Sequence, residues 1–123
     1  MAIPNLSYVL LFVSKPIESG IFYSRILGVS PVEEGPTFVL FALPNGMKLG
    51  LWSSKTAEPK VTARPGSSEI CFSEEDVDAA FSRLQKMGVQ MAQEPTDMDF
   101  GRTFVALDPD GHRIRIFRLL EQV

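Results

Sequence analysis

The sequence is poor in the side chains that most often bind metal ions. Its 123 residues include one histidine and one cysteine, too few for the His-rich or Cys-rich sites that hold zinc. Any metal would therefore be held almost entirely by carboxylates. The single cysteine, Cys71, also excludes a disulfide within the chain.

Positive charge and long apolar runs are scarce as well. Twelve Lys and Arg residues stand against fifteen Asp and Glu, a net charge of -3, so the broad basic field of nucleic-acid-binding proteins is missing. The longest apolar stretch, residues 8–13, is far shorter than the roughly 20 residues of a membrane helix. No positive charge precedes it, as a signal peptide would require. We expect no nucleic acid and no membrane as partners, and a cytoplasmic location.

What the sequence does contain is typical of one compact domain. Hydrophobic residues make up 45% and charged residues 22% of the chain, which is ordinary for a folded protein of this length. The first half predicts a strand, a helix capped by Ser14 and ended by Gly28, and three strands. The ranges of these strands are 6–13, 29–33, 37–43 and 47–53.

The second half repeats the pattern after about 60 residues. A capping box from Ser73 to Asp76 predicts the start of a helix that Gly88 ends. The expected strands are 69–72, 89–93, 103–107 and 113–119. Asn45-Gly46 and Asp110-Gly111 predict two-residue hairpin turns before the last strand of each half. We expect a single domain, 1–123, with modules 1–54 and 67–123 joined by a linker at 55–66.

The duplicated βαβββ pattern resembles the vicinal oxygen chelate superfamily of glyoxalases, bleomycin resistance proteins and dioxygenases. The motifs that carry the resemblance are Phe22-Tyr23-Ser24-Arg25-Ile26-Leu27-Gly28 and Leu107-Asp108-Pro109-Asp110-Gly111-His112. It implies an α+β fold in which two modules form curved mixed sheets around a cleft, often in a homodimer. The segments 49–53, 95–101 and 103–115 look like those of phenazine antibiotic resistance proteins, which sequester an aromatic antibiotic without changing it.

The resemblance also implies four positions where enzymatic relatives hold a metal ion. Here these positions carry Tyr8, Gly50, Glu69 and Arg115. Glycine has no side chain, a neutral phenol is a poor ligand, and a fixed guanidinium charge repels a cation. We therefore expect neither a metal nor another cofactor, and no catalytic residue. Glu69 and Arg115 are expected to form an ion pair, either structural or as ligand anchors.

Strand alternation extends this expectation to the neighbouring side chains, because residues i and i+2 share a face. If Gly50 and Arg115 face the cleft, so do Trp52 and Phe117, while Leu49, Leu51, Ile114 and Ile116 pack beneath the helices. Two-residue hairpin turns would add Phe41 and Phe104 to the cleft, unless a bulge shifts the register. The expected ligand-binding residues are Trp52, Arg115, Glu69, Tyr8, Phe41, Phe104, Phe117 and Phe100.

Each of these residues also has a plain structural interpretation. Trp52 is as readily a core or interface aromatic, Cys71 an inert small residue, and His112 an exposed turn residue. Residues 96–102 are either a flexible lid, which we favour, or a loop. The leading hypothesis is a homodimeric protein that confers drug resistance by binding a planar aromatic antibiotic, phenazine- or bleomycin-like.

Two alternatives remain open at this point. One is a metal-dependent glyoxalase-like lyase or dioxygenase whose ligands lie elsewhere, for example Glu69 with Asp99 or Asp108. The other is a fold used purely for interaction, as in drug sensing.

Overall fold

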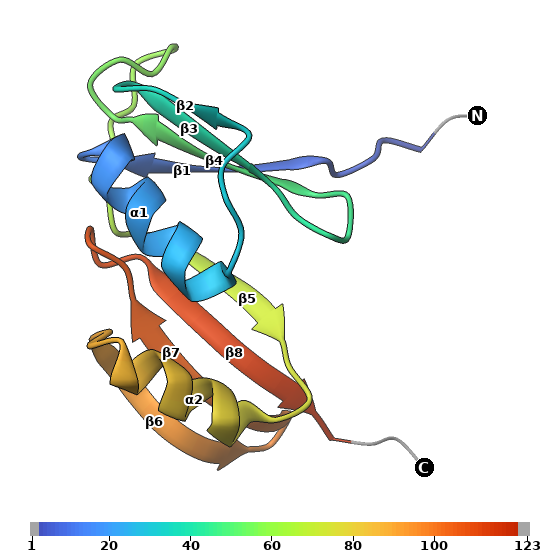
Figure 1. Ribbon diagram of the computed structural model, residues 1–123. Coiled ribbons are helices and arrows are strands. Elements are labelled where there is room, and N and C mark those ends of the chain that lie inside the picture. The colour runs from blue at the N-terminus through green and yellow to red at the C-terminus, as the bar shows by residue number, and fades with distance from the viewer. Residues whose placement is uncertain (1–2, 121–123) are drawn as a thin grey trace. The chain divides into compact units, whose positions relative to one another are not determined.

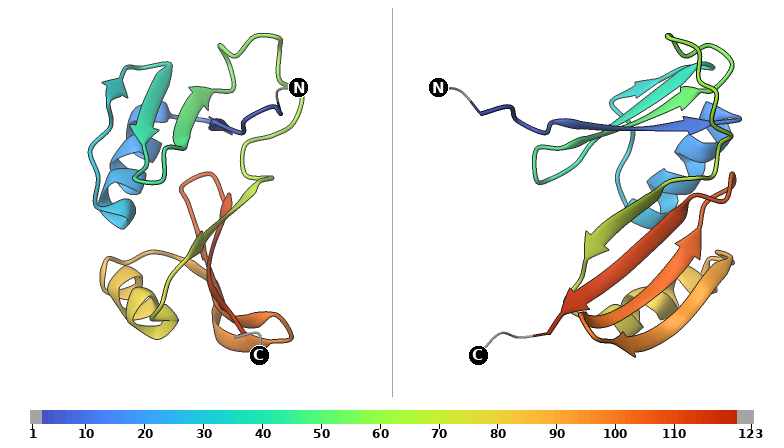
Figure 2. Two further views of the ribbon diagram at one scale, coloured as in Figure 1. Left: turned by 90° about the vertical axis from the view of Figure 1, so that its right-hand side faces the viewer. Right: turned by 180° about the vertical axis from the view of Figure 1, so that it is seen from behind.

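The structure is a computed structural model that describes residues 3–120. The chain divides into two compact units, one ending at Pro65 and the other beginning at Gly66. Each unit contains one sheet and one helix, visible in Figures 1 and 2.

The N-terminal unit is a four-stranded mixed sheet with the strand order β1-β4-β3-β2. Its elements are β1 (Tyr8–Val13), α1 (Pro16–Leu27), β2 (Glu33–Glu34), β3 (Phe38–Ala42) and β4 (Lys48–Ser53). Helix α1 packs on β3 and β4. Gly20 of α1 allows this close approach, because a Cβ there would lie only 3.1 Å from Val39 Cγ1.

The C-terminal unit repeats this arrangement with the strand order β5-β8-β7-β6. Its elements are β5 (Glu69–Ser73), α2 (Val77–Lys86), β6 (Met91–Met98), β7 (Gly101–Leu107) and β8 (Arg113–Leu119). Helix α2 covers one face of this sheet, as Figure 1 shows. The α+β class and the duplicated βαβββ pattern are thus confirmed. The expected cleft between modules stays a prediction.

The cores lie on the helix-facing side of each sheet, as strand alternation predicts. Leu49 and Leu51 of β4 and Ile114 and Ile116 of β8 are all buried. Their neighbours in sequence on the same strands point to the other face, which no helix of the same unit covers. These two uncovered faces carry the side chains of interest below.

Helix starts differ from the predicted ones by one to three residues. The N-cap of α1 is Lys15 rather than Ser14, followed by Pro16, whose fixed φ suits the first turn. The capping box at Ser73 is wrong, because Ser73 belongs to β5 and the N-cap of α2 is Asp76. Its carboxylate accepts a hydrogen bond from the Ala79 N–H at 2.9 Å. The helix is therefore capped by the carboxylate of Asp76, three residues after the predicted cap at Ser73.

Both predicted hairpin turns are one residue longer than expected. Ala42 pairs with Lys48 and Leu107 with Arg113. In each hairpin the next two residues toward the turn are joined by a backbone hydrogen bond, from Leu43 to Met47 and from Asp108 to His112, and enclose a three-residue loop. Gly46 and Gly111 occupy the last loop position with φ of 89° and 92°. A three-residue loop characteristically places a glycine in this left-handed conformation. The extra residue shifts the register of β3 and β7 by one and reverses the faces of their side chains.

No helix within residues 3–120 has the length and apolar character needed to cross a membrane.

Candidate ligand-binding site

The uncovered face of the N-terminal sheet is mostly aromatic and aliphatic. We call it the aromatic face; its side chains come from alternate positions of β1, β3 and β4. They are Tyr8, Leu10, Phe12, Phe38, Leu40, Ala42, Lys48 and Trp52, with Gly50 among them, and Glu33 of β2 is paired with Leu40. Tyr8 and Leu10 are 48% and 39% exposed. An apolar surface of this kind favours a ligand that removes it from water.

Trp52 lies at the centre of an aromatic cluster on this face. The centroid of its ring system is 6.3 Å from the Phe12 ring, tilted by 34°, and 6.3 Å from the Phe38 ring at an angle of 84°. These are the tilted and edge-to-face arrangements that aromatic pairs prefer. Trp52 is half-buried, so part of its ring surface is available to a further aromatic group.

Gly50 keeps the middle of the aromatic face free of a side chain of its own. A Cβ at this position would lie 2.5 Å from Leu10 Cδ2 and 3.0 Å from Phe38 Cζ. The ends of two neighbouring side chains therefore occupy the space above the glycine. Any larger residue would push them aside.

Lys48 is the one cation on the aromatic face. Its Nζ lies 5.3 Å from the centroid of the Tyr8 ring and donates a hydrogen bond of 3.4 Å to the Tyr8 hydroxyl. Such a cation–π contact is a weak attraction at an exposed site. Both contacts are with neutral groups.

The uncovered face of the C-terminal sheet is charged, and we call it the ionic face. Glu69 on β5 accepts from Arg113 Nε at 2.7 Å with one carboxylate oxygen and from Arg115 Nε at 3.0 Å with the other. The hydrogen bond from Arg115 and the two positive charges lower the pKa of Glu69. The direct Glu69–Arg115 pair is as the sequence predicts.

Arg115 has further partners that hold its guanidinium in place. Its Nη1 donates to Thr103 Oγ1 at 3.1 Å and to Gln93 Oε1 at 3.4 Å. The guanidinium carbon also lies 5.9 Å from the centroid of the Phe100 ring. With 15% of its side chain exposed, Arg115 is the fixed centre of the ionic face. Sequence reasoning missed Gln93 and Thr103, because nothing in their local pattern marks them as partners of an arginine on β8.

Cys71 lies next to this network as an unactivated thiol. Its Sγ is 3.9 Å from a carboxylate oxygen of Glu69. Burial raises the pKa of Cys71, and the negative charge of Glu69 adds to the effect. This agrees with the expected inert residue.

Two of the expected ligand-binding aromatics belong to the cores instead. Phe41 and Phe104 are 0% exposed, and Phe104 makes an edge-to-face contact with Phe81 of α2 at 5.4 Å. Their placement on the cleft is wrong because the hairpin loops have three residues. Phe38 and Thr103 stand opposite Trp52 and Phe117 in their place.

Residues 96–102 form a paired hairpin rather than an irregular loop, and their role as a lid stays a prediction. Thr96 pairs with Thr103 and Met98 with Gly101 at the joined ends of β6 and β7. Arg102 links the hairpin to α2, because it donates to Asp97 within the hairpin at 2.9 Å and to Asp78 of α2 at 2.8 Å. The hydrogen bonds from Arg102 lower the pKa of Asp78.

His112 is buried rather than exposed. It is 2% exposed, and its two ring nitrogens lie 3.2 Å from the backbone N–H groups of Gly66 and Ser68. A neutral imidazole has one acceptor nitrogen, so it accepts from one of them at a time. The histidine thus fastens the start of the C-terminal unit to its last hairpin.

The carboxylates proposed for an alternative metal site do not gather around one point. Asp108 is buried and accepts the N–H groups of Asp110 and His112 at 2.9 Å each, which stabilises the turn. Within residues 3–120, no three His, Cys, Asp or Glu side chains are grouped as metal ligands would be.

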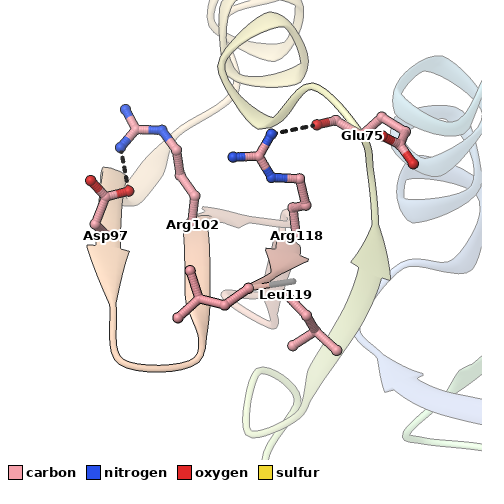
Figure 3. Close-up of a pocket in the computed structure, with 6 residues that line it drawn as sticks. Glu75, Asp97, Arg102, Arg118 and Leu119 are labelled. Carbon is pink, nitrogen blue, oxygen red and sulfur yellow. Dashed lines mark hydrogen bonds and ion pairs between the residues drawn. The ribbon is translucent and has the colours of Figure 1, made fainter. Parts of the chain in front are cut away.

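A separate hollow of about 520 Å³ lies in the C-terminal unit (Figure 3). It is lined by Glu75, Asp97, Arg102, Arg118, Leu119 and Leu120. Arg102 is paired with carboxylates, and Arg118 donates to the Glu75 carbonyl at 3.3 Å. The Arg102 charge is thus compensated by two carboxylates, whereas the partner of Arg118 is a neutral carbonyl.

Similarity to known proteins agrees with this architecture. Residues 5–116 match the profile of the Glyoxalase/Bleomycin resistance protein/Dioxygenase superfamily. The chain is 36% identical over 119 residues to the phenazine antibiotic resistance protein EhpR of Enterobacter agglomerans, a match that covers 92% of this chain and 89% of that protein.

Solved structures show the same fold. A protein of Agrobacterium tumefaciens determined by solution NMR is 45% identical, with a TM-score of 0.86 over 97% of this chain and 100% of that one. A glyoxalase/bleomycin resistance protein/dioxygenase from Nocardioides, 23% identical, has a TM-score of 0.80 over 100% of this chain and 88% of its own and is alike in fold alone. The chain therefore belongs to the glyoxalase/bleomycin resistance protein/dioxygenase superfamily.

Proposed function

We propose that the protein binds a planar aromatic antibiotic of the phenazine type and confers resistance by sequestering it unchanged. The observation that carries the proposal is the cluster of Trp52, Phe12 and Phe38 around Gly50 on the uncovered face of the N-terminal sheet. The similarity to a phenazine antibiotic resistance protein supports the same ligand class.

The physical basis is stacking together with burial of apolar surface. A flat conjugated ring system that contacts Trp52 gains about 0.5 to 1.5 kcal/mol per aromatic pair beyond the effect of area burial. Leu10, 39% exposed, adds aliphatic surface beside the rings. Because Gly50 has no side chain, the ends of Leu10 and Phe38 lie over the middle of the face, and a ring plane would rest on these two side chains.

The chemistry of the titratable groups supports binding without reaction. The low pKa of Glu69 makes its carboxylate a poor proton acceptor, and the raised pKa of Cys71 makes its thiol a poor nucleophile. His112 is enclosed by backbone N–H groups. None of these groups lies on the aromatic face.

Trp52 fluorescence tests the proposal directly, because it is the only tryptophan in the chain. Titration with phenazine is expected to quench the emission saturably, and chromatography should recover the phenazine unchanged. Calorimetry should show a loss of affinity of about tenfold, or about 1.4 kcal/mol, for Trp52→Ala. Phe22→Ala, on α1 and away from the sheet face, is the matched control and should bind as the unaltered protein does.

Two outcomes would overturn the proposal. Absence of saturable binding by phenazine, with Trp52→Ala indistinguishable from the unaltered protein, would exclude the aromatic face as the site. Conversion of the phenazine, together with a stoichiometric divalent ion retained after dialysis, would favour the metal-dependent enzyme instead. The homodimer expected from the sequence stays a prediction, which sedimentation equilibrium would test.

A further inference from the structure

We propose that Lys48 selects, among planar aromatic compounds, those that carry an anionic substituent such as a carboxylate. This inference rests on the proposed function and concerns the same aromatic face. It assigns the role of anionic anchor to Lys48 rather than to Arg115, which the sequence had indicated.

The surroundings of Lys48 leave its charge uncompensated. Its two contacts are the hydroxyl and the ring of Tyr8, both neutral. Within residues 3–120, no carboxylate lies within ion-pair distance of its ammonium. An ammonium with only neutral partners forms a charge-assisted hydrogen bond with an anion that approaches it.

Arg113 and Arg115 are in the opposite situation. Each donates to an oxygen of Glu69, at 2.7 and 3.0 Å, and Arg115 also donates to Thr103 and Gln93. A ligand carboxylate would have to displace Glu69 to use Arg115. Lys48 requires no such displacement.

The spacing along β4 places Lys48 suitably for a ligand over Trp52. Lys48, Gly50 and Trp52 alternate on one face, so at about 3.3 Å per residue the first and last lie about 13 Å apart at Cα. Gly50 lies midway. Rings stacked on Trp52 and extending over Gly50 therefore direct their far edge toward Lys48, whose flexible stem covers the remaining distance.

Tyr8 contributes to this arrangement as a positioning residue. Its ring and its hydroxyl hold the ammonium beside the face. Loss of the hydroxyl in Tyr8→Phe removes one contact and retains the ring. We expect that change to weaken the preference for an anionic ligand less than removal of the lysine charge does.

The test compares phenazine with phenazine-1-carboxylate in calorimetric titrations at about neutral pH. The unaltered protein should bind the carboxylate about tenfold more tightly, and Lys48→Met should remove that preference while phenazine itself binds with unchanged affinity. Lys48→Arg should retain the preference. Lys60→Met, which removes an exposed lysine of the same unit, is the matched control and should behave as the unaltered protein.

Salt provides a second measurement. The preference for the carboxylate should decrease as ionic strength rises, because screening weakens a partly exposed charge pair. Equal binding of both compounds by the unaltered protein, or a preference that survives Lys48→Met and disappears in Arg115→Gln, would overturn this inference and leave the proposed function intact. Failure of both compounds to bind would overturn the proposed function itself.

Discussion

The two sheets have the same strand order, and the register of β1, β4 and β3 corresponds to that of β5, β8 and β7, yet their uncovered faces differ in chemistry. Tyr8 pairs with Lys48 in the N-terminal sheet as Glu69 pairs with Arg113 in the C-terminal one. The same correspondence places Gly50 against Arg115 and Trp52 against Phe117. Two of these equivalent positions differ in charge, since Tyr8 corresponds to Glu69 and Gly50 to Arg115, whereas Trp52 and Phe117 are both aromatic.

The two faces differ in the contacts that their side chains make with one another. In the C-terminal unit, Glu69 and its two arginines satisfy one another, and Thr103 and Gln93 hold Arg115 in place. In the N-terminal unit, Trp52 instead contacts the rings of Phe12 and Phe38, and Tyr8 and Leu10 remain 48% and 39% exposed. A duplicated backbone can therefore carry an ionic network on the sheet of one unit and an aromatic cluster on the sheet of the other.

The largest expected effect is a loss of stability when a core side chain of either unit is removed. Phe41→Ala and Phe104→Ala should each lower the free energy of unfolding by about 3 to 5 kcal/mol, because both rings are completely buried. Phe38→Ala, on the uncovered face, should cost clearly less. Urea denaturation measures all three.

Equal costs for Phe41→Ala and Phe38→Ala would contradict the assignment of the two faces. They would favour the register of a two-residue hairpin instead.

A second variant transfers the ionic pair into the aromatic face. Tyr8→Glu combined with Gly50→Arg recreates the positions of Glu69 and Arg115 and fills the space that Leu10 now occupies. Phenazine affinity should fall by more than about tenfold, or about 1.4 kcal/mol, in calorimetric titrations. Circular dichroism should show a folded protein.

Tyr8→Glu alone, which keeps the glycine, is the control for the added charge. It should lose less affinity than the double variant. Undiminished binding by the double variant would show that a glycine at position 50 is not needed.

The smallest effect concerns the ionic face and its dependence on pH. Glu69→Gln should lower the free energy of unfolding at about pH 7 by about 1 kcal/mol, because two arginines lose a charged acceptor on a partly exposed surface. The pKa of Glu69 is lower in the folded chain than the ordinary value of a glutamate side chain. Its contribution is therefore complete above that value and is lost as the pH falls through the folded pKa.

Urea denaturation between about pH 3 and pH 7 should thus show a steeper acid decline for the unaltered protein than for Glu69→Gln. Parallel curves for the two proteins would mean that the carboxylate contributes nothing to stability. Phe100→Leu, which keeps the charges, should retain the steep decline.

The sequence predicted the elements and the faces of the closing strands because those depend on local patterns. The alternation of Lys48 and Gly50 with Leu49 and Leu51 determines which side of β4 packs under a helix. The strand opposite depends instead on loop length, and a single added residue exchanged Phe41 for Phe38 on the uncovered face. Asn-Gly and Asp-Gly occur in loops of either length, so the dipeptide alone could not decide.

The partners of side chains were partly predictable for the same reason. Glu69 and Arg115 could be paired through corresponding strand positions. Gln93 comes from a strand whose pairing with β7 contains register shifts, so no count along the sequence would place its amide beside Arg115. The burial of His112 likewise depends on a segment 44 residues earlier in the chain, at Ser68.

The surroundings of Gly50 also determine how fast the aromatic face can change its shape. The space above it is filled by the end of the Leu10 side chain and the edge of the Phe38 ring. The three atoms nearest to a Cβ built at Gly50 all belong to these two side chains, and none belongs to the backbone. Side-chain rotamers at a partly exposed position exchange within picoseconds to nanoseconds. If the proposed function is correct, the Leu10 and Phe38 side chains would therefore rearrange far faster than a ligand arrives, and binding would require no movement of the sheet.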